Sequence, residues 1–341
     1  MALSLSFPSF LVLFSLCLVF TFTSSTSTSQ SSSTIASKQL NFWSLNVHNE
    51  MPQALVSKLS PLTEQDSEAL FASFSKQQVS SSSSSKLCSL GNLACAAKLD
   101  IITSLVKAYS GYDNNKLNPS AHLAKDDPFS FFRLSILKNG NKINLPDLHD
   151  IYPSRSFLPS QIASKITLDL SWLKRVFPQS FVSINTKEAI QMTIFHCNAP
   201  NSKGEIKKCP RSLEEMIEFS KNALGGDNLV ALTSESTKGS GKELIIGSIK
   251  QYVPKQIVSC HEVFLPFSTY YCHVISSTRL YAVELIEPQT NVKVNNVLAI
   301  CHMDTSTWAK EHVAFKLLKL SPGKGEACHW FSQTDLAWIN A

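Results

Sequence analysis

The last third of the chain has the hydrophobic pattern of β-strands. Apolar and β-branched residues gather there in seven short stretches that are bounded by Gly, Pro, Asn or Ser, and this punctuation is typical of strands in an antiparallel sheet. The predicted strands cover residues 229–233, 243–252, 256–266, 267–275, 279–286, 293–302 and 312–320.

Helical spacing is found before these strands. Ser212 and Glu215 form a capping box that predicts a helix ending at Gly225. A second helix is predicted over 186–195, and a third is predicted to begin at Thr63. Helices followed by a mainly antiparallel sheet place the chain in the α+β class.

One apolar run stands out in the polar N-terminal part of the chain. Residues 10–22 are almost continuously apolar and are followed by a Ser/Thr-rich run, which is the layout of a signal peptide. The run is too short to cross a bilayer, because a spanning helix needs about 20 residues. We therefore expect a signal peptide over 1–25, a secreted protein and no membrane span.

The composition divides the remaining chain in two. Residues 26–128 are polar and uneven, with an unbroken serine tract over 80–85, and such segments bury too little apolar surface to offset the entropy of ordering. We predict a variable, partly disordered arm with short helices over 26–128. Apolar content rises after Pro128, so a folded domain is predicted over 129–341.

The formal net charge of +5 is a modest excess. It suits weak attraction to a polyanion such as pectin, and an ordinary solvated surface explains it equally well. We expect no nucleic-acid partner. The one Asn-x-Ser sequence, which begins at Asn118, is blocked by Pro119, so N-glycosylation is not expected.

The cysteine count predicts disulfides. Cys17 lies in the predicted signal peptide, which leaves an even set in an oxidising compartment and allows up to four bridges. The set consists of Cys88, Cys95, Cys197, Cys209, Cys260, Cys272, Cys301 and Cys328. The short separations favour local bridges Cys88–Cys95 and Cys197–Cys209, and the other four are expected to pair among themselves.

Four of these cysteines are followed directly by histidine. The dipeptides are separated by 10, 27 and 25 residues and begin at Cys260, Cys272, Cys301 and Cys328. Neighbouring residues of a strand point to opposite faces, so sulfur atoms and imidazoles are sorted into two layers. A hairpin turning at Pro266 would place Cys260 opposite Cys272, although pairing with the later dipeptides fits the sequence equally.

Three interpretations of the dipeptides remain open. In the first, a zinc site uses both Cys and His ligands. In the second, the cysteines form disulfides that cross-link the sheet and the histidines support the sheet. In the third, the histidines bind copper. Neutral imidazole suits copper, zinc or nickel. The candidate metal ligands are His261, His273, His302 and His329.

Other residues near the dipeptides have weaker signals. Asp304 could orient an imidazole through its second ring nitrogen, with a turn-forming Asp as the alternative. We interpret His196 as a surface or helix-end histidine. Trp308 and Trp330 are expected to be core or rim aromatics, with stacking on a sugar as the alternative for either.

The motifs together resemble the BURP domain of plant proteins over about residues 129–341. The resemblance rests on the spacing of the four dipeptides, the opening Phe131-Phe132, and the closing Cys328-His329-Trp330. Within that family, the motifs at 155–159 and 301–306 are similar to those of the non-catalytic beta subunit of polygalacturonase.

This resemblance implies an apoplastic protein of the cell wall. It would bind the polygalacturonase catalytic subunit and pectin, and would adjust pectin solubilisation without cleaving it. The sequence offers no carboxylate pair or Ser-His-Asp ordering typical of a hydrolase, so no enzymatic activity on pectin is expected. The chain lacks the Phe-x-x-Tyr repeats of this branch between Cys95 and Asp126, which puts properties of those repeats in doubt.

A second branch of the same family implies an alternative. Its members are copper-dependent peptide cyclases that cross-link Tyr or Trp side chains, and the four histidines of the dipeptides would hold the copper. The only candidate substrate aromatics in the arm are Tyr109, Tyr112 and Trp43.

Overall fold

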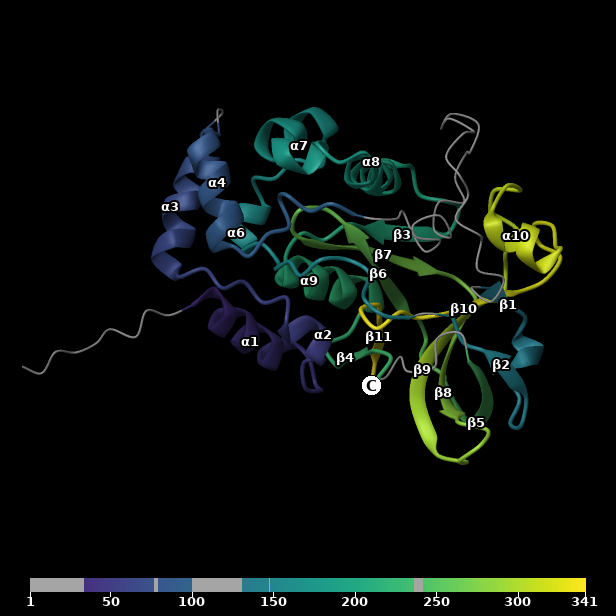
Figure 1. Ribbon diagram of the computed structural model, residues 1–341. Coiled ribbons are helices and arrows are strands. Elements are labelled where there is room, and N and C mark those ends of the chain that lie inside the picture. Colours follow the sequence, from purple (N-terminus) through teal and green to yellow (C-terminus); the bar gives the residue numbers. More distant parts are fainter. Residues whose placement is uncertain (1–33, 77–78, 100–130, 147, 236–241) are drawn as a thin grey trace, which may run out of the picture. The chain divides into compact units, whose positions relative to one another are not determined.

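Two antiparallel sheets carry the four Cys-His dipeptides in the computed structural model (Figure 1). The structure describes residues 34–76, 79–99, 131–146, 148–235 and 242–341, which belong to one compact unit. The predicted signal peptide, Tyr109 and Tyr112 lie outside the described residues. In the described part of the chain, no helix is long and apolar enough to cross a membrane.

The first sheet has six strands in the order β1-β10-β9-β8-β5-β2. Their bounds are β1 Phe131–Phe132, β2 Lys142–Asn144, β5 Glu243–Tyr252, β8 Thr278–Ile286, β9 Lys293–His302 and β10 Ala327–Trp330. The second sheet has five strands in the order β3-β7-β6-β11-β4. Their bounds are β3 Glu205–Lys208, β4 Leu229–Leu232, β6 Val258–Phe264, β7 Ser268–Ile275 and β11 Leu336–Asn340.

The helices of the described residues lie mostly before the strands in sequence. Their bounds are α1 Ile35–Asn46, α2 Gln53–Val56, α3 Glu64–Phe74, α4 Ser81–Leu90, α6 Ser160–Ala163, α7 Leu170–Val176, α8 Ile184–Asn198, α9 Leu213–Leu224 and α10 Val313–Leu318. Two short 3-10 turns occur at Leu134–Ile136 and Pro178–Phe181. The predicted α+β class with antiparallel, disulfide-bonded sheets is confirmed.

Local sequence explains the best-predicted helices. Ser212 accepts a hydrogen bond from the N–H of Glu215 at the start of α9, and Gly225 ends that helix in the left-handed conformation with φ 65°. Thr63 caps α3 in the same way by accepting from the N–H of Asp66.

Two predictions about local structure were wrong. The serine tract forms the start of α4, because Ser80 caps this helix and Leu87 anchors it in the core with no exposed surface. The predicted strand at 312–320 is instead the helix α10, which begins where the Nδ1 of His312 accepts the N–H of Ala314.

Apolar clusters cover both faces of the second sheet. One cluster joins α9 and arm residues to Cys260 and Cys272, while another joins Leu298 and Ile300 of the first sheet to Ala337 and other residues of the second. The two sheets therefore pack on each other, and helices cover the opposite face of the second sheet.

Residues of the predicted arm are part of this core. Trp43 is 3% exposed and its ring centroid lies 5.5 Å from that of Trp338. The side-chain amide of Asn49 both donates to the carbonyl and accepts from the N–H of Ala231. The boundary at residue 128 stays a prediction, but the described arm shares its apolar clusters with the later region.

Candidate functional site

Four disulfides occur in the described residues. They join Cys88–Cys95, Cys197–Cys209, Cys260–Cys272 and Cys301–Cys328. The first two are the local bridges favoured from the sequence. The last two join residues directly opposite each other on β6–β7 and on β9–β10. No thiol of these eight cysteines is left to bind zinc, so the zinc site with cysteine ligands is excluded.

Strand alternation separates the sulfur atoms from the imidazoles. Cys260 and Cys272 lie in the apolar cluster beneath α9, and Cys301 and Cys328 lie in a separate cluster on the first sheet. All four cysteines are fully buried. Each disulfide therefore fixes a pair of strands whose following histidines face away from it.

The four imidazoles meet where the two sheets face each other. The ring centroids of His261 and His329, on different sheets, lie 5.4 Å apart. The other neighbouring pairs lie at 5.5 Å for His261 and His273, 5.6 Å for His302 and His329, and 6.2 Å for His273 and His302. The imidazoles thus form a closed ring of four.

Carboxylates orient the two imidazoles of the second sheet. The Nδ1 of His273 lies 3.2 Å from Oε1 of Glu205, and the Nδ1 of His261 lies 3.5 Å from Oδ2 of Asp335. An ionised carboxylate only accepts hydrogen bonds. The proton of His273 therefore resides on Nδ1, which leaves Nε2 as the unprotonated nitrogen, whereas the Nδ1 of His261 only lies close to Asp335.

Neutral oxygen acceptors orient the imidazoles of the first sheet in the same way. The Nδ1 of His329 lies 3.2 Å from the carbonyl oxygen of Trp330, which can only accept. The Nδ1 of His302 lies 3.3 Å from the hydroxyl of Thr278, whose proton is donated to the carbonyl of Ile275. His273, His302 and His329 therefore have the tautomer with Nε2 unprotonated, the form that coordinates metals through Nε2.

Burial favours the neutral form of His273, His302 and His329. It lowers the pKa of His329 to about 3, and it holds the pKa of His302 well below its ordinary range, with the neighbouring imidazoles adding to this effect. Burial also lowers the pKa of His273, against the opposing effect of the hydrogen bond that its Nδ1 donates to Glu205. Burial would raise the pKa of Glu205, but interactions with His273, Ser202 and Tyr271 lower it to about 2.

The donor set fits copper, zinc or nickel in chemistry. Neutral imidazoles such as those of His273, His302 and His329 are suitable ligands for these ions, and His261 adds a fourth imidazole beside them. Within the described residues, however, no three His, Cys, Asp or Glu side chains already converge at metal-binding distances. A bound ion would therefore require the rings to turn inward from their present separations.

The structure places the other predicted site residues differently. Asp304 is exposed and accepts the N–H of Ser306, which corresponds to the alternative of a turn-forming Asp, and the carboxylates against imidazoles are Glu205 and Asp335. His196 does lie in the last turn of α8, but it is only 8% exposed. Trp330 is buried in the core.

A cavity of about 990 Å³ opens onto the four imidazoles. His196, His312, Trp308 and Glu205 also line it, and sequence reasoning did not assign His312 or Glu205 to the site. The only sequence signal for His312 is its position four residues after Trp308. Glu205 lies beside His273 because β3 pairs with β7, which no spacing in the sequence indicates.

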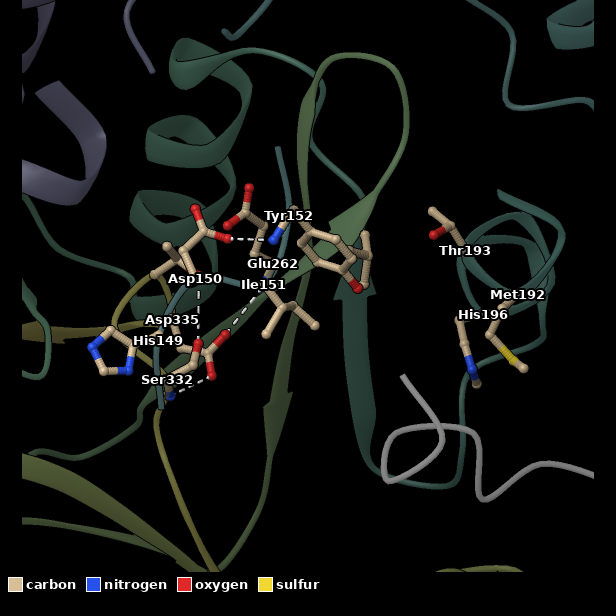
Figure 2. Close-up of a pocket in the computed structure, with 12 residues that line it drawn as sticks. His149, Asp150, Ile151, Tyr152, Met192, Thr193, His196, Glu262, Ser332 and Asp335 are labelled. Carbon is tan, nitrogen blue, oxygen red and sulfur yellow. Dashed lines mark hydrogen bonds between the residues drawn. The ribbon is translucent and has the colours of Figure 1, made fainter. Parts of the chain in front are cut away.

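A smaller cavity of about 530 Å³ lies behind the ring and shares His196 with the larger one. Figure 2 shows Asp335 there, held by the backbone N–H groups of Glu262 and Ser332. The carboxylate of Glu262 pairs at 2.8 Å with Lys58 from the arm, and all three charged side chains are nearly or fully buried. A chain of contacts thus links the arm to His261.

Comparisons with known proteins agree with this arrangement. The tomato (Solanum lycopersicum) polygalacturonase-1 non-catalytic subunit beta is 40% identical over 221 residues, which cover 63% of this chain and 35% of that protein. The Arabidopsis thaliana polygalacturonase 1 beta-like protein 1 is 39% identical over the same shares. BURP domain-containing protein 12 of Oryza sativa subsp. japonica is 35% identical over 70% of this chain and 37% of that protein.

The part of the chain that a known domain family matches includes all four Cys-His dipeptides. This chain spans about a third of the length of these relatives. The BURP domain matches residues 130–340, which begin beside β1 and end within β11. The chain therefore belongs to the BURP domain family.

Proposed function

We propose that this protein is a secreted, non-catalytic regulator of the plant cell wall that binds a polygalacturonase and pectin. The observation that carries the proposal is the 40% identity to a polygalacturonase non-catalytic subunit over 221 residues. The net charge of +5 supports attraction to an acidic polysaccharide. The predicted signal peptide supports an apoplastic location.

A binding and activity assay tests this proposal. The secreted protein is expected to retain a purified plant polygalacturonase and de-esterified pectin in pull-down experiments. It should release no reducing ends from pectin alone, and it should change the rate at which the polygalacturonase releases them. Loss of both interactions in the intact, oxidised protein would contradict the proposal.

The ring of imidazoles favours a second candidate function, a copper-dependent peptide cyclase. The observation is the shared tautomer of three buried, neutral histidines, His273, His302 and His329, with His261 in contact with two of them. Bound copper would supply one-electron oxidation chemistry, and the Nδ1 acceptors such as Glu205 and Asp335 would orient the rings that hold it. Trp43 is unsuited as a substrate because it is buried against Trp338.

Metal content and peptide mass separate the two candidates. Elemental mass spectrometry of the secreted protein should detect copper that is lost when His261, His273, His302 and His329 are changed to Ala. Cyclisation predicts that a peptide containing Tyr109 or Tyr112 loses two hydrogens after copper incubation. Unchanged peptide masses with bound copper would leave a metal site without this activity.

A further inference from the structure

The cavity in front of the imidazole ring has two contrasting walls. Its empty space of about 990 Å³ includes the mouth that opens to solvent. One wall is formed by the segment around β3, with Lys203 and Lys207, and the other by Trp308 and His312. His273 also lines the cavity, next to Glu205 of β3.

The β3 wall offers positive charge. Lys207 donates through Nζ to the carbonyl oxygens of His196 and Pro200 at 3.1 and 3.4 Å, which uses two of its three N–H groups and fixes the ammonium at the cavity. Exposed Lys203 adds a second cation. The one carboxylate of this wall, Glu205, already accepts hydrogen bonds from neighbouring donors.

These neighbouring donors stabilise the negative charge of Glu205. The hydroxyl of Tyr271 lies 2.7 Å from its Oε1, the N–H of Ser202 lies 2.9 Å from its Oε2, and His273 supplies a third contact. A carboxylate with three donors attracts a further cation weakly, so the two lysines dominate the charge of the wall.

The opposite wall offers a flat apolar surface and a hydrogen-bond donor. The rings of Trp308 and His312 have centroids 4.3 Å apart. The Nδ1 of His312 accepts the N–H of Ala314 at 3.2 Å, so the proton of this neutral ring resides on Nε2. His312 therefore has the opposite tautomer from His273 and acts as a donor.

The base of the cavity offers an acceptor. The Nε2 of His273 is buried and makes no hydrogen bond within the described residues, while its Nδ1 is engaged by Glu205. A buried acceptor without a partner carries a free-energy cost that a ligand hydroxyl or a metal ion would relieve.

We propose that the metal-free cavity binds an acidic sugar, a uronate residue of a pectic chain; this inference rests on the proposed function. A uronate combines a carboxylate for Lys203 and Lys207, a flat C–H face for Trp308 and hydroxyl donors for Nε2 of His273. The side chain of a tyrosine peptide also has a ring and a hydroxyl, but it lacks the carboxylate that the lysines would bind.

Calorimetric titration of trigalacturonate into the chelator-treated full-length protein tests this proposal. Trp308→Ala is expected to lower the affinity about tenfold, the order of one aromatic contact together with its buried area, and Trp308→Phe should retain part of it. Lys203→Met should lower the affinity and weaken its salt dependence. Lys250→Met removes an equally exposed lysine that does not line the cavity and should leave the affinity unchanged.

The outcomes separate this inference from the proposed function. Binding of trigalacturonate and polygalacturonate that no cavity variant weakens would overturn the site and leave the proposed function standing. Binding of a tyrosine peptide but not of trigalacturonate would overturn the uronate as the ligand. Failure of the wild-type protein to bind either pectic ligand would overturn the inference together with the pectin part of the proposed function, and polygalacturonase retention would then be tested separately.

Discussion

The contact made by one ring nitrogen decides what each histidine around the cavity can do. Acceptors at Nδ1 leave Nε2 unprotonated in His273, His302 and His329, and the oxygens responsible include the carboxylate of Glu205. The backbone donor at Nδ1 of His312 has the reverse effect. Residues of one type therefore provide ligands on one side of the cavity and a hydrogen-bond donor on the other.

The titration of His312 predicts part of the pH dependence of stability. Burial lowers its pKa from 6.5 to about 4, so between these values the unfolded chain binds a proton that the folded protein does not. The free energy of unfolding should therefore fall as the pH is lowered from 6.5 to 4. His312→Asn keeps a side-chain acceptor for α10 but does not titrate.

Urea denaturation at pH 4.5 and pH 7 measures this effect. The wild-type protein should lose more stability between the two conditions than His312→Asn does, because the other buried histidines contribute equally to both proteins. Equal losses would contradict the link between burial of His312 and pH.

The buried cation Lys58 predicts a second residue-scale effect. Lys58 and Arg155 both lie 2.8 Å from Oε1 of Glu262, and all three side chains are at most 4% exposed. Lys58→Met should lower the free energy of unfolding by about 3 kcal/mol, because it leaves a buried carboxylate with one cation fewer. Chemical denaturation of the oxidised protein gives this value.

A surface pair provides the matched control. Lys38 pairs with Glu64 at 2.7 Å, but these side chains are 57% and 34% exposed. Lys38→Met should therefore cost less than about 1 kcal/mol. Similar losses of unfolding free energy in the two variants would show that the buried ion pair of Lys58 contributes no more to stability than an exposed ion pair does.

At the scale of elements, alternation along strands was the most informative sequence feature. It predicted the sorting of sulfur atoms from imidazoles, whereas the spacing around Pro266 left open whether Cys260 pairs with Cys272, which the β6–β7 hairpin shows. It failed at 312–320, where closely spaced apolar residues also fit a helix and the capping role of His312 was not recognised.

The sequence did not predict contacts between elements that are far apart along the chain. Glu205 meets His273 through the pairing of β3 with β7, and Asp335 meets His261 from the turn before β11. Asp304 is the carboxylate that the sequence suggests as a partner for an imidazole, because it is close to His302 in sequence. Closeness in sequence does not determine which carboxylates face the four imidazoles.

The cross-strand disulfide of the first sheet supports both stability and the site. Changing Cys301 and Cys328 to Ala should lower the free energy of unfolding by about 3 kcal/mol, because a long loop of the unfolded chain is released. It should also reduce copper uptake, since His302 and His329 follow the bridged residues directly. Denaturation and elemental analysis measure the two effects.

Changing Cys88 and Cys95 to Ala is the control for this prediction. This bridge closes a separation of only 7 residues, compared with 27 for Cys301–Cys328, and neither cysteine is followed by histidine. It should cost less stability and leave copper uptake unchanged. Equal copper uptake in the two double variants would contradict the role of the cross-strand bridge in placing the imidazoles.

At the scale of the whole molecule, the described arm acts as part of the folded domain. The N–H of Phe157 donates to the carbonyl of Lys58, and the N–H of Ala94 donates to that of Pro266. These contacts join segments on both sides of residues 100–130, which lie outside the described residues. Composition alone predicts a separate polar arm. It does not show which few apolar residues of the arm pack into a core that the arm shares with the later region.

A cut between residues 100 and 130 tests this unity. A protease site introduced there would produce two fragments, and each of the four disulfides lies within one fragment. The fragments should nevertheless elute together in gel filtration and separate only in denaturant, because Trp43 and Lys58 remain buried against the larger fragment. Lys58→Met should weaken this association, whereas Lys38→Met should not. Separation of the wild-type fragments in native buffer would mean that the arm and the domain fold as independent units.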